Sequence, residues 1–282
     1  MIYNIDNISG ELLGKVEDLK IETPKTFSSL AMIIVETAFS LGIGYSTTKK
    51  ATRVLVKAML PDDKKEAFEK LTDKEKDKAV EKCSVTVFDF LCLIYGKNNK
   101  DEILKAQESD EAMCGLFANQ RETCEKFWRS GGVLRTKVEP TREGKGRTIW
   151  KRCETVSEAL LKMNRMKIQT IADFNGKDSL DMWGFLKSVT GINDAGASYV
   201  FMLTGREDIC KFDTHIKAFV SKGCPSDGKE CGIKKMDYFT AQLIFRGMVK
   251  KYNIGKRDKV TVRTLEYSIW KREIENKSSK MH

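Results

Sequence analysis

The chain has 282 residues, of which 41% are hydrophobic and 32% are charged, and its formal net charge is +10. This length can bury a substantial core without disulfides or metals, and it fits one large domain or two smaller ones. No stretch approaches the ~18 consecutive apolar residues of a membrane span, and the N-terminal sequence lacks the features of a secretory signal. We therefore expect an intracellular protein, in the cytoplasm, nucleoid or nucleus, with no membrane partner.

The positive charge is concentrated in two segments. Residues 211–282 carry 17 Lys and Arg against 8 Asp and Glu, and residues 121–167 carry 13 against 6. Two basic segments on a mildly acidic body favour a polyanionic partner such as nucleic acid. A solvated, lysine-rich exterior is the alternative that charge alone leaves open.

Taken in chain order, the hydrophobic pattern of the first half is predominantly helical. Residues 27–41 form an apolar run that predicts a buried helix, and residues 46–60 predict a second helix. The charged stretch 62–83 predicts an exposed helix or helical pair. Residues 85–95 are apolar enough for either a buried helix or a strand.

The middle of the chain interrupts this pattern once. Residues 130–149 contain two adjacent glycines, Pro140 and several basic residues, which favours a basic loop or a small β-hairpin. Helical periodicity resumes over 154–167 and again over 179–188. The expected fold is therefore all-α, with the 130–149 segment left open between a loop and a small β-hairpin.

One segment, residues 185–220, is more specific than the rest. Gly191 stands where a tight turn between two helices requires a positive φ. Asn193 stands at a second such position, which asparagine tolerates better than most residues. The helix after this turn would present backbone N–H groups and its dipole to a phosphate. An ordinary helix–helix corner is the alternative for the turn taken by itself.

The second half of this segment places an acidic residue at the start of a further helix. Asp213 is followed by the apolar positions Ile216, Phe219 and Val220 at helical spacing. Taken in isolation, Asp213 would be an N-cap, which is a common role for aspartate at a helix start.

Together these residues resemble the helix-hairpin-helix DNA glycosylases of the endonuclease III type. The hairpin of that family corresponds to Val189-Thr190-Gly191-Ile192-Asn193-Asp194-Ala195-Gly196-Ala197, and its aspartate motif corresponds to Phe212-Asp213-Thr214-His215-Ile216. The resemblance is clear over 185–220 and weakens upstream toward residue 154. It implies a two-lobed helical fold that grips double-stranded DNA as a monomer, with Asp213 as the catalytic carboxylate beside a flipped-out nucleotide.

The resemblance also divides the chain into two lobes. Residues 26–220 would form the core lobe, with the hairpin at about 185–201 and an insertion-like charged region at 62–120. Residues 1–25 plus 221–282 would form a second, basic helical lobe.

The candidate DNA-binding residues come from the hairpin, from the position two residues before Asp213 and from the basic loop. They are Gly191, Ile192, Asn193, Ala195, Gly196, Lys211, Arg129, Arg135, Lys145 and Arg147. Glu36, in the apolar run at 27–41, would border the base pocket in this family. The alternative for Glu36 is a carboxylate on the solvent-exposed face of its helix.

The chain departs from the family at two places. Bifunctional members carry a lysine nucleophile where this chain has Ala195, so the resemblance implies a monofunctional glycosylase. Many relatives bind a four-iron cluster through four cysteines, but Cys224 and Cys231 reproduce only the first spacing and no cysteine follows them. We therefore expect no iron–sulfur cluster and no other metal cofactor, although the family admits a monovalent cation at the hairpin backbone.

The leading hypothesis is a monofunctional DNA glycosylase that removes a damaged, mispaired or modified base. In it, Asp213 stabilises the oxocarbenium ion and activates water. Two alternatives stay open. One is a non-catalytic helix-hairpin-helix DNA-binding protein in which Asp213 is only a cap, and the other is a bifunctional glycosylase/lyase that uses a displaced lysine.

Overall fold

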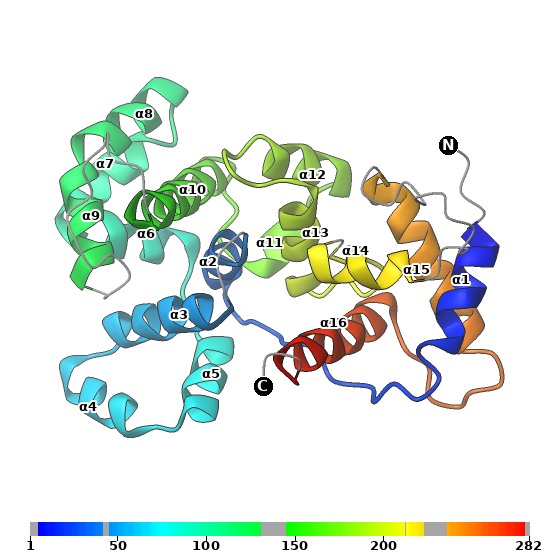
Figure 1. The fold of residues 1–282 in the computed structure, drawn as a ribbon. Coiled ribbons are helices and arrows are strands. Elements are labelled where there is room, and N and C mark those ends of the chain that lie inside the picture. The colour runs from blue at the N-terminus through cyan, green and yellow to red at the C-terminus, as the bar shows by residue number, and fades with distance from the viewer. Residues whose placement is uncertain (1–4, 42–44, 131–144, 212, 223–235, 280–282) are drawn as a thin grey trace. The chain divides into compact units, whose positions relative to one another are not determined.

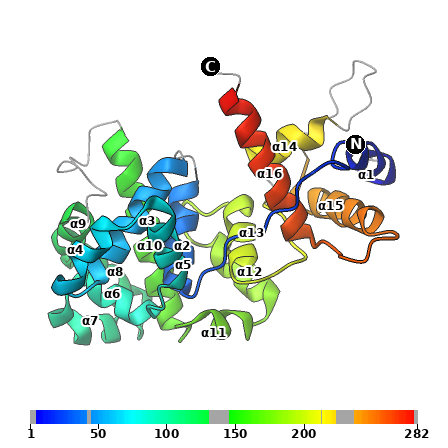
Figure 2. The same cartoon turned by 90° about the horizontal axis from the view of Figure 1, so that it is seen from below.

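The computed structural model describes residues 5–41, 45–130, 145–211, 213–222 and 236–279. Within these residues the chain forms sixteen α-helices, one short 3-10 turn and no strand, which confirms the predicted all-α class for this part of the chain. The helices form two compact units, which we call the terminal unit (residues 1–25 and 194–282) and the central unit (residues 26–193) (Figure 1, Figure 2). None of the described helices is long and apolar enough to cross a membrane.

Most of the helices belong to the central unit. They are α2 (Leu30–Ser40), α3 (Tyr45–Met59), α4 (Asp62–Lys70), α5 (Asp73–Lys82), α6 (Val87–Tyr95), α7 (Lys100–Lys105), α8 (Asp110–Asn119), α9 (Arg121–Ser130), α10 (Lys145–Arg165), α11 (Ile171–Asn175) and α12 (Ser179–Lys187).

Helix α2 forms the centre of the central unit. Every residue from Leu30 to Phe39 is buried, and the helix packs against α3, α6 and α10. Ser29 caps its N-terminus by accepting a hydrogen bond from Met32 N, and the Ser29 hydroxyl donates to the Val85 carbonyl 2.6 Å away. The buried helix predicted from the apolar run is confirmed.

The charged region at 62–120 has two different parts. Residues 62–82 form the pair α4 and α5, as the sequence predicted, and a capping box of Thr72 with Glu75 starts the second helix. Helix α6, in contrast, packs against α2, α9 and α10, with residues such as Phe90 fully buried. The segment left open between helix and strand is therefore a helix. Helix α6 therefore belongs to the core of the central unit.

The segment predicted as a basic loop or β-hairpin is described only in part. Residues 131–144 lie outside the described residues. Residues 145–149 belong to α10, so the expected loop or hairpin does not extend to residue 149. The helix starts earlier than its strongest periodicity because residues 145–153 contain no proline and a single glycine, which one helix can accommodate.

The terminal unit joins the two ends of the chain. Its helices are α1 (Ile5–Gly14), α13 (Asp194–Leu203), α14 (Thr214–Ser221), α15 (Tyr238–Tyr252) and α16 (Val262–Ser279). Helix α1 packs along α15, where the Ser9 hydroxyl donates to the Ile244 carbonyl at 3.1 Å. A Cβ at Gly247 would lie 2.7 Å from Ser9 Oγ, so this glycine permits the close approach of the two helices.

The division between the units differs in part from the expected lobes. The boundary at 25/26 coincides with the expected one, whereas the second boundary lies at 193/194 and not at 220/221. Helix α14 belongs with the terminal helices because its apolar residues Ile216, Phe219 and Val220 enter the core that α1, α15 and α16 also line.

Candidate functional site

Asp213 directly precedes α14 and has the geometry of an N-cap. Its backbone is extended, with φ −88° and ψ −174°, and its Oδ1 accepts hydrogen bonds from His215 N at 2.9 Å and Ile216 N at 3.0 Å. Ile216 is fully buried, which fixes the first turn of α14 in the core of the terminal unit. The predicted helix start is confirmed, and Asp213 makes the capping contacts that its position suggested.

The second carboxylate oxygen of Asp213 lies near Lys211. Lys211 Nζ is 4.0 Å from Asp213 Oδ2 and 3.8 Å from the centre of the Tyr199 ring. The side chains of Lys211 and Asp213 are only 11% and 16% exposed. Lys211, a predicted DNA-binding residue, therefore holds its ammonium against a carboxylate and an aromatic ring, both of which attract a cation.

Two charged residues of α16 complete this group. Glu266 is only 3% exposed, and burial raises the pKa of its carboxyl, with the negative charge of Asp213 adding to the shift. Arg263 is also buried, and desolvation lowers the pKa of its guanidinium. We call the set the carboxylate cluster, and its members are Asp213, Lys211, Tyr199, Glu266 and Arg263.

The loop that carries Asp213 is fixed from α15. The side-chain amide of Gln242 donates to the Cys210 carbonyl at 2.8 Å and accepts from Cys210 N at 2.9 Å, and all of these atoms are buried. Asp213 is thus positioned from both sides, by the pinned backbone before it and by the helix after it. A carboxylate held in this way can stabilise a developing positive charge or orient a water molecule without first reorganising.

The turn of the predicted hairpin lies in the central unit, where α10 holds it. Gly191 has a φ of +90°, as the sequence predicted. A Cβ at this position would lie 2.7 Å from Thr155 Oγ1, and that hydroxyl donates to the Thr190 carbonyl at 2.8 Å. Thr190 N in turn donates to Glu158 at 3.1 Å. Both the conformation and the close approach therefore require glycine.

Asn193 does not adopt the positive φ that the sequence predicted. Among the described residues other than glycine, only Lys167 has a positive φ. Asn193 stands directly before α13, where an extended backbone with negative φ is usual, and the turn needs only one left-handed residue, Gly191. The boundary between the units follows Asn193, so the turn belongs to the central unit and the helix after it to the terminal unit.

The other hairpin residues flank this boundary. Ile192 is buried in the central unit. Ala195 and Gly196 lie in the first turn of α13 in the terminal unit. Ala195, which the resemblance aligns with the lyase lysine, is therefore a helical residue.

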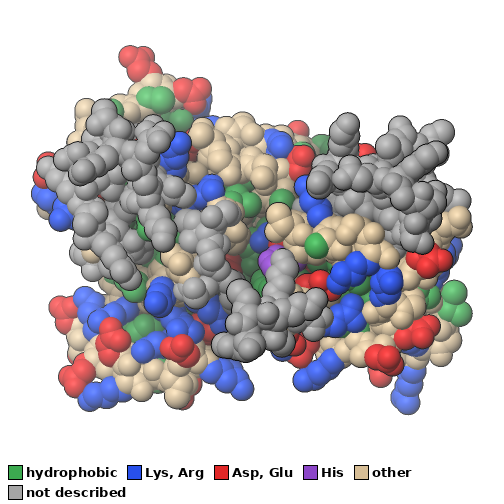
Figure 3. All heavy atoms as spheres, viewed as in Figure 1, with side chains coloured by type: hydrophobic (Ala, Val, Ile, Leu, Met, Phe, Trp, Pro, Cys, Tyr) green, Lys and Arg blue, Asp and Glu red, His purple; other side chains and the backbone are tan. Residues whose placement is uncertain are grey.

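The predicted basic loop residues are placed only in part. Arg129 is 44% exposed in α9, and its guanidinium is 3.9 Å from the Glu125 carboxylate. Lys145 and Arg147 belong to the first turn of α10, but their side chains, and all of Arg135, lie outside the described part of the chain. Over the described residues of the face in Figure 3, Lys and Arg are interspersed with Asp and Glu.

Glu36 is buried in α2, with 1% of its surface exposed, so it does not lie on a solvent-exposed helix face. Its part in a base pocket stays a prediction.

Cys224 and Cys231 lie outside the described residues. Within the described residues, no group of three or more His, Cys, Asp or Glu is placed to hold a metal ion.

Sequence reasoning missed the α16 members of the carboxylate cluster. Glu266 and Arg263 lie about fifty residues beyond Asp213, and no local motif connects them to it. The available signal is a charged residue beside the apolar positions Leu265 and Ile269, which are buried in α16, since buried charges call for a partner.

No protein-family model matches the chain, and neither a curated protein nor a solved structure matches it.

Proposed function

We propose that the protein is a monofunctional DNA glycosylase, acting as a monomer on intracellular double-stranded DNA. The observation that carries the proposal is the way Asp213 is held. Its Oδ1 accepts hydrogen bonds from two backbone N–H groups, while its Oδ2 lies 4.0 Å from Lys211 Nζ. The resemblance of the hairpin and the aspartate motif to glycosylases supports DNA as the substrate.

In the proposed reaction the base leaves with the electron pair of the N-glycosidic bond, and C1′ of the sugar gains oxocarbenium character. The ionised carboxylate of Asp213 stabilises that charge. A water molecule then forms the new bond to C1′ and gives its proton to the carboxylate, while the departing base takes a proton from solvent. The products are the free base and an abasic site.

The neighbours of Asp213 suit this role. Burial favours the protonated form of Glu266 by raising the pKa of its carboxyl, so Glu266 adds little second negative charge to the site. The ammonium of Lys211 balances the charge of Asp213 before substrate binds. The site is thereby set for one carboxylate facing one developing cation.

The decisive experiment is a base-release screen on duplexes that carry uracil, oxidised, alkylated or hypermodified bases. We expect the protein to release one class of base and to leave abasic sites that break only after alkali treatment. Asp213→Asn should bind the same duplex and release no base. Undiminished release by Asp213→Asn would overturn the proposed mechanism.

A non-catalytic DNA-binding protein is the second candidate, and it is favoured by the complete capping geometry of Asp213. Such a protein would bind DNA with a steep salt dependence and release nothing from the screen.

A bifunctional glycosylase/lyase is the third candidate, and it is favoured by the 4.0 Å distance between Lys211 Nζ and Asp213 Oδ2. Borohydride would then trap a covalent complex with abasic DNA, because it reduces a Schiff base to a stable amine. Lys211→Gln would lose that complex. If the enzyme is monofunctional, neither the parent protein nor Lys211→Gln gives a trapped complex.

A further inference from the structure

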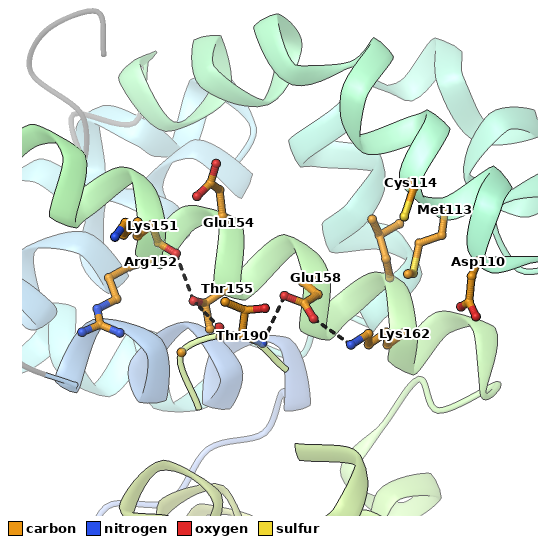
Figure 4. Close-up of a pocket in the computed structure, with 12 residues that line it drawn as sticks. Asp110, Met113, Cys114, Lys151, Arg152, Glu154, Thr155, Glu158, Lys162 and Thr190 are labelled. Atoms are coloured by element: carbon orange, nitrogen blue, oxygen red, sulfur yellow. Dashed lines mark hydrogen bonds and ion pairs between the residues drawn. The ribbon is translucent and has the colours of Figure 1, made fainter. Parts of the chain in front are cut away.

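Two pockets of the central unit differ in the charge of their linings. The pocket along α10 lies beside the hairpin turn and is drawn in Figure 4. Its charged lining residues are Asp110, Glu154, Glu158, Lys151, Arg152 and Lys162. Glu158 and Lys162 pair directly, with 2.7 Å between Oε1 and Nζ. Because carboxylates and basic groups line this pocket in equal number, it favours neither an anion nor a cation.

The second pocket, which we call the α6 pocket, is lined mainly by residues of α3, α5 and α6. Its volume of about 680 Å³ lies within the ~300–1,000 Å³ of typical small-molecule sites. Lys82, Lys97 and Lys100 line it, and Asp89 is the carboxylate among its described lining residues. The lining therefore carries a net positive charge. The α6 pocket shares no lining residue with the pocket along α10, so it is a separate feature of the molecule.

The lysines and the carboxylate of the α6 pocket differ in their partners. Lys82, Lys97 and Lys100 are exposed, and their ammonium groups form no ion pair or hydrogen bond among the described residues. The Asp89 carboxylate accepts a hydrogen bond from Thr86 Oγ1 at 2.7 Å, at the N-terminal cap of α6. The pocket thus has unpaired cations and a carboxylate that already has a partner.

Two of the lysines lie together beyond the last residue of α6. Lys97 begins a 3-10 turn and Lys100 directly follows that turn, and side chains three residues apart in such a turn project from the same side. Burial raises the pKa of the Cys92 thiol, and the nearby charge of Lys100 opposes that shift. Asp89 lies in the first turn of α6, roughly 9 Å along the helix axis from its last residue. The pocket therefore has a cationic end.

The rest of the lining is largely apolar. Its apolar side chains include Val56, Met59, Leu60, Phe68, Ala79 and Leu93. Val56 and Phe68 are buried, whereas Met59, Leu60 and Leu93 are partly exposed. Apolar surface of this kind gains free energy when an apolar group covers it and displaces water. The α6 pocket therefore combines a cationic end with an apolar body.

We propose that the α6 pocket binds an alkyl carboxylate, the anion of a free fatty acid. Its carboxylate would lie at Lys97 and Lys100, where an ammonium donates charge-assisted hydrogen bonds to carboxylate oxygens. Its alkyl chain would lie on the apolar side chains of α3, α4 and α6. A sugar or a nucleotide base would leave polar groups unpaired against this surface, whereas an alkyl chain has none. The proposal does not rest on the proposed glycosylase function.

Isothermal titration calorimetry of the full chain with octanoate, decanoate and dodecanoate tests the apolar body. Each methylene group that enters the pocket should tighten binding by up to about fourfold, and the heat capacity change on binding should be negative. Decanol and decyltrimethylammonium carry the same alkyl chain as decanoate without its negative charge. Both should bind more weakly than decanoate, the cation by about tenfold or more.

Substitution of the two lysines tests the cationic end. Lys97→Gln combined with Lys100→Gln should weaken decanoate binding by about fivefold, because each exposed ion pair contributes little, and should leave decanol binding unchanged. Lys74→Gln combined with Lys78→Gln is the matched control. Both control positions are exposed lysines of α5 outside the pocket lining, so the net charge falls equally while decanoate binding should stay unchanged.

Cys83 supplies a local readout, because its free thiol is partly exposed in the pocket lining. Modification of Cys83 by N-ethylmaleimide, followed by peptide mass spectrometry, should slow about tenfold at ten times the dissociation constant of decanoate. Ala79→Phe places a large side chain in the lining and should abolish both the binding heat and the protection of Cys83. The lysine variants change exposed side chains, so they keep the test valid if Ala79→Phe does not fold.

The absence of binding heat with all three carboxylates would overturn the proposal. So would equal affinity for decanoate and decyltrimethylammonium, undiminished binding in the Lys97 and Lys100 double variant, or decanoate binding that leaves Cys83 unprotected. Base release is scored separately on the same protein, and either result of the calorimetry leaves the proposed glycosylase function standing.

Discussion

The carboxylate cluster of the terminal unit and the pocket along α10 in the central unit both gather acidic and basic side chains, but they balance their charges differently. In the cluster, Lys211 lies beside Asp213, and burial favours the neutral form of Glu266. In the pocket along α10, Glu158 is paired with Lys162 and Glu154 accepts a hydrogen bond from the Trp150 indole, while the Arg152 Nε has no hydrogen-bond partner among the described residues. In the cluster, two capping hydrogen bonds hold Asp213 without a ligand, which suits preorganised catalysis. The pocket instead contains a buried donor that no described residue satisfies, which is unfavourable.

The largest effect should come from the carboxylate of Asp213. Asp213→Asn keeps the capping oxygen, since Asn and Asp are equally good N-caps, but removes the negative charge that meets the oxocarbenium ion. We expect base release to fall by about 10²–10⁴-fold with DNA binding and thermal stability retained. Single-turnover base release and fluorescence anisotropy measure the two quantities.

Asp237→Asn is the matched control, because Asp237 caps α15 in the same way through Thr240 N. It should leave base release unchanged. Equal losses from both substitutions would mean that Asp213 acts through helix stability alone, and the cluster would not be a preorganised catalytic group.

The next effect should come from the hairpin turn that borders the pocket along α10. Gly191→Ala meets both the positive φ and a contact of 2.7 Å with Thr155 Oγ1. We expect a loss of about 2–4 kcal/mol in the free energy of unfolding, measured by denaturant titration.

Gly205→Ala separates the two causes, because Gly205 has a φ of +104° and no neighbour within 4 Å of its would-be Cβ. Its free energy of unfolding should fall by about 1 kcal/mol, which is the cost of the positive φ alone. If Gly191→Ala lowers the free energy of unfolding by no more than this, the Thr155 side chain moves away from the new methyl group.

A smaller, pH-dependent effect should come from Glu266. Its pKa is raised in the folded protein, so above about pH 4.5 the unfolded chain releases this proton while the folded chain retains it. The contribution of Glu266 to stability is therefore complete at low pH and declines as the pH rises. Glu266→Gln stays neutral, so its melting temperature should fall less between about pH 5 and pH 8.

Thermal unfolding across that pH range tests this difference, with the exposed Glu275→Gln of the same helix as control. An unchanged pH slope in Glu266→Gln would mean that Glu266 is charged in the folded state. The cluster would then hold two carboxylate charges beside Lys211 and Arg263, and Asp213 would not be the single carboxylate that faces the developing cation.

The sequence predicted the local features of the candidate site well. The start of α14 at Asp213 and the positive φ of Gly191 follow from residue type and spacing over a few positions. The positive φ predicted for Asn193 was wrong. Asparagine can adopt a positive φ but does not require one, and the start of α13 directly after it favours an extended backbone. The all-α class followed from periodicity along most of the chain.

The long-range features could not be predicted in the same way. Glu266 reaches the cluster because α16 packs on α14, a contact between segments far apart in the chain. The pocket around Arg152 needs α8, α10 and the hairpin turn to converge. Hydrophobic patterns identify which face of a helix is buried, but they do not specify the partner that covers it.

The packing of α1 on α15 has a consequence for synthesis of the chain. Helix α1 leaves the ribosome before the central unit, yet the Ile244 carbonyl that accepts the Ser9 hydrogen bond emerges more than two hundred residues later. The central unit is continuous and can fold while translation proceeds. The first helix must wait with its apolar face uncovered, so the nascent chain is most open to chaperones and aggregation during that interval.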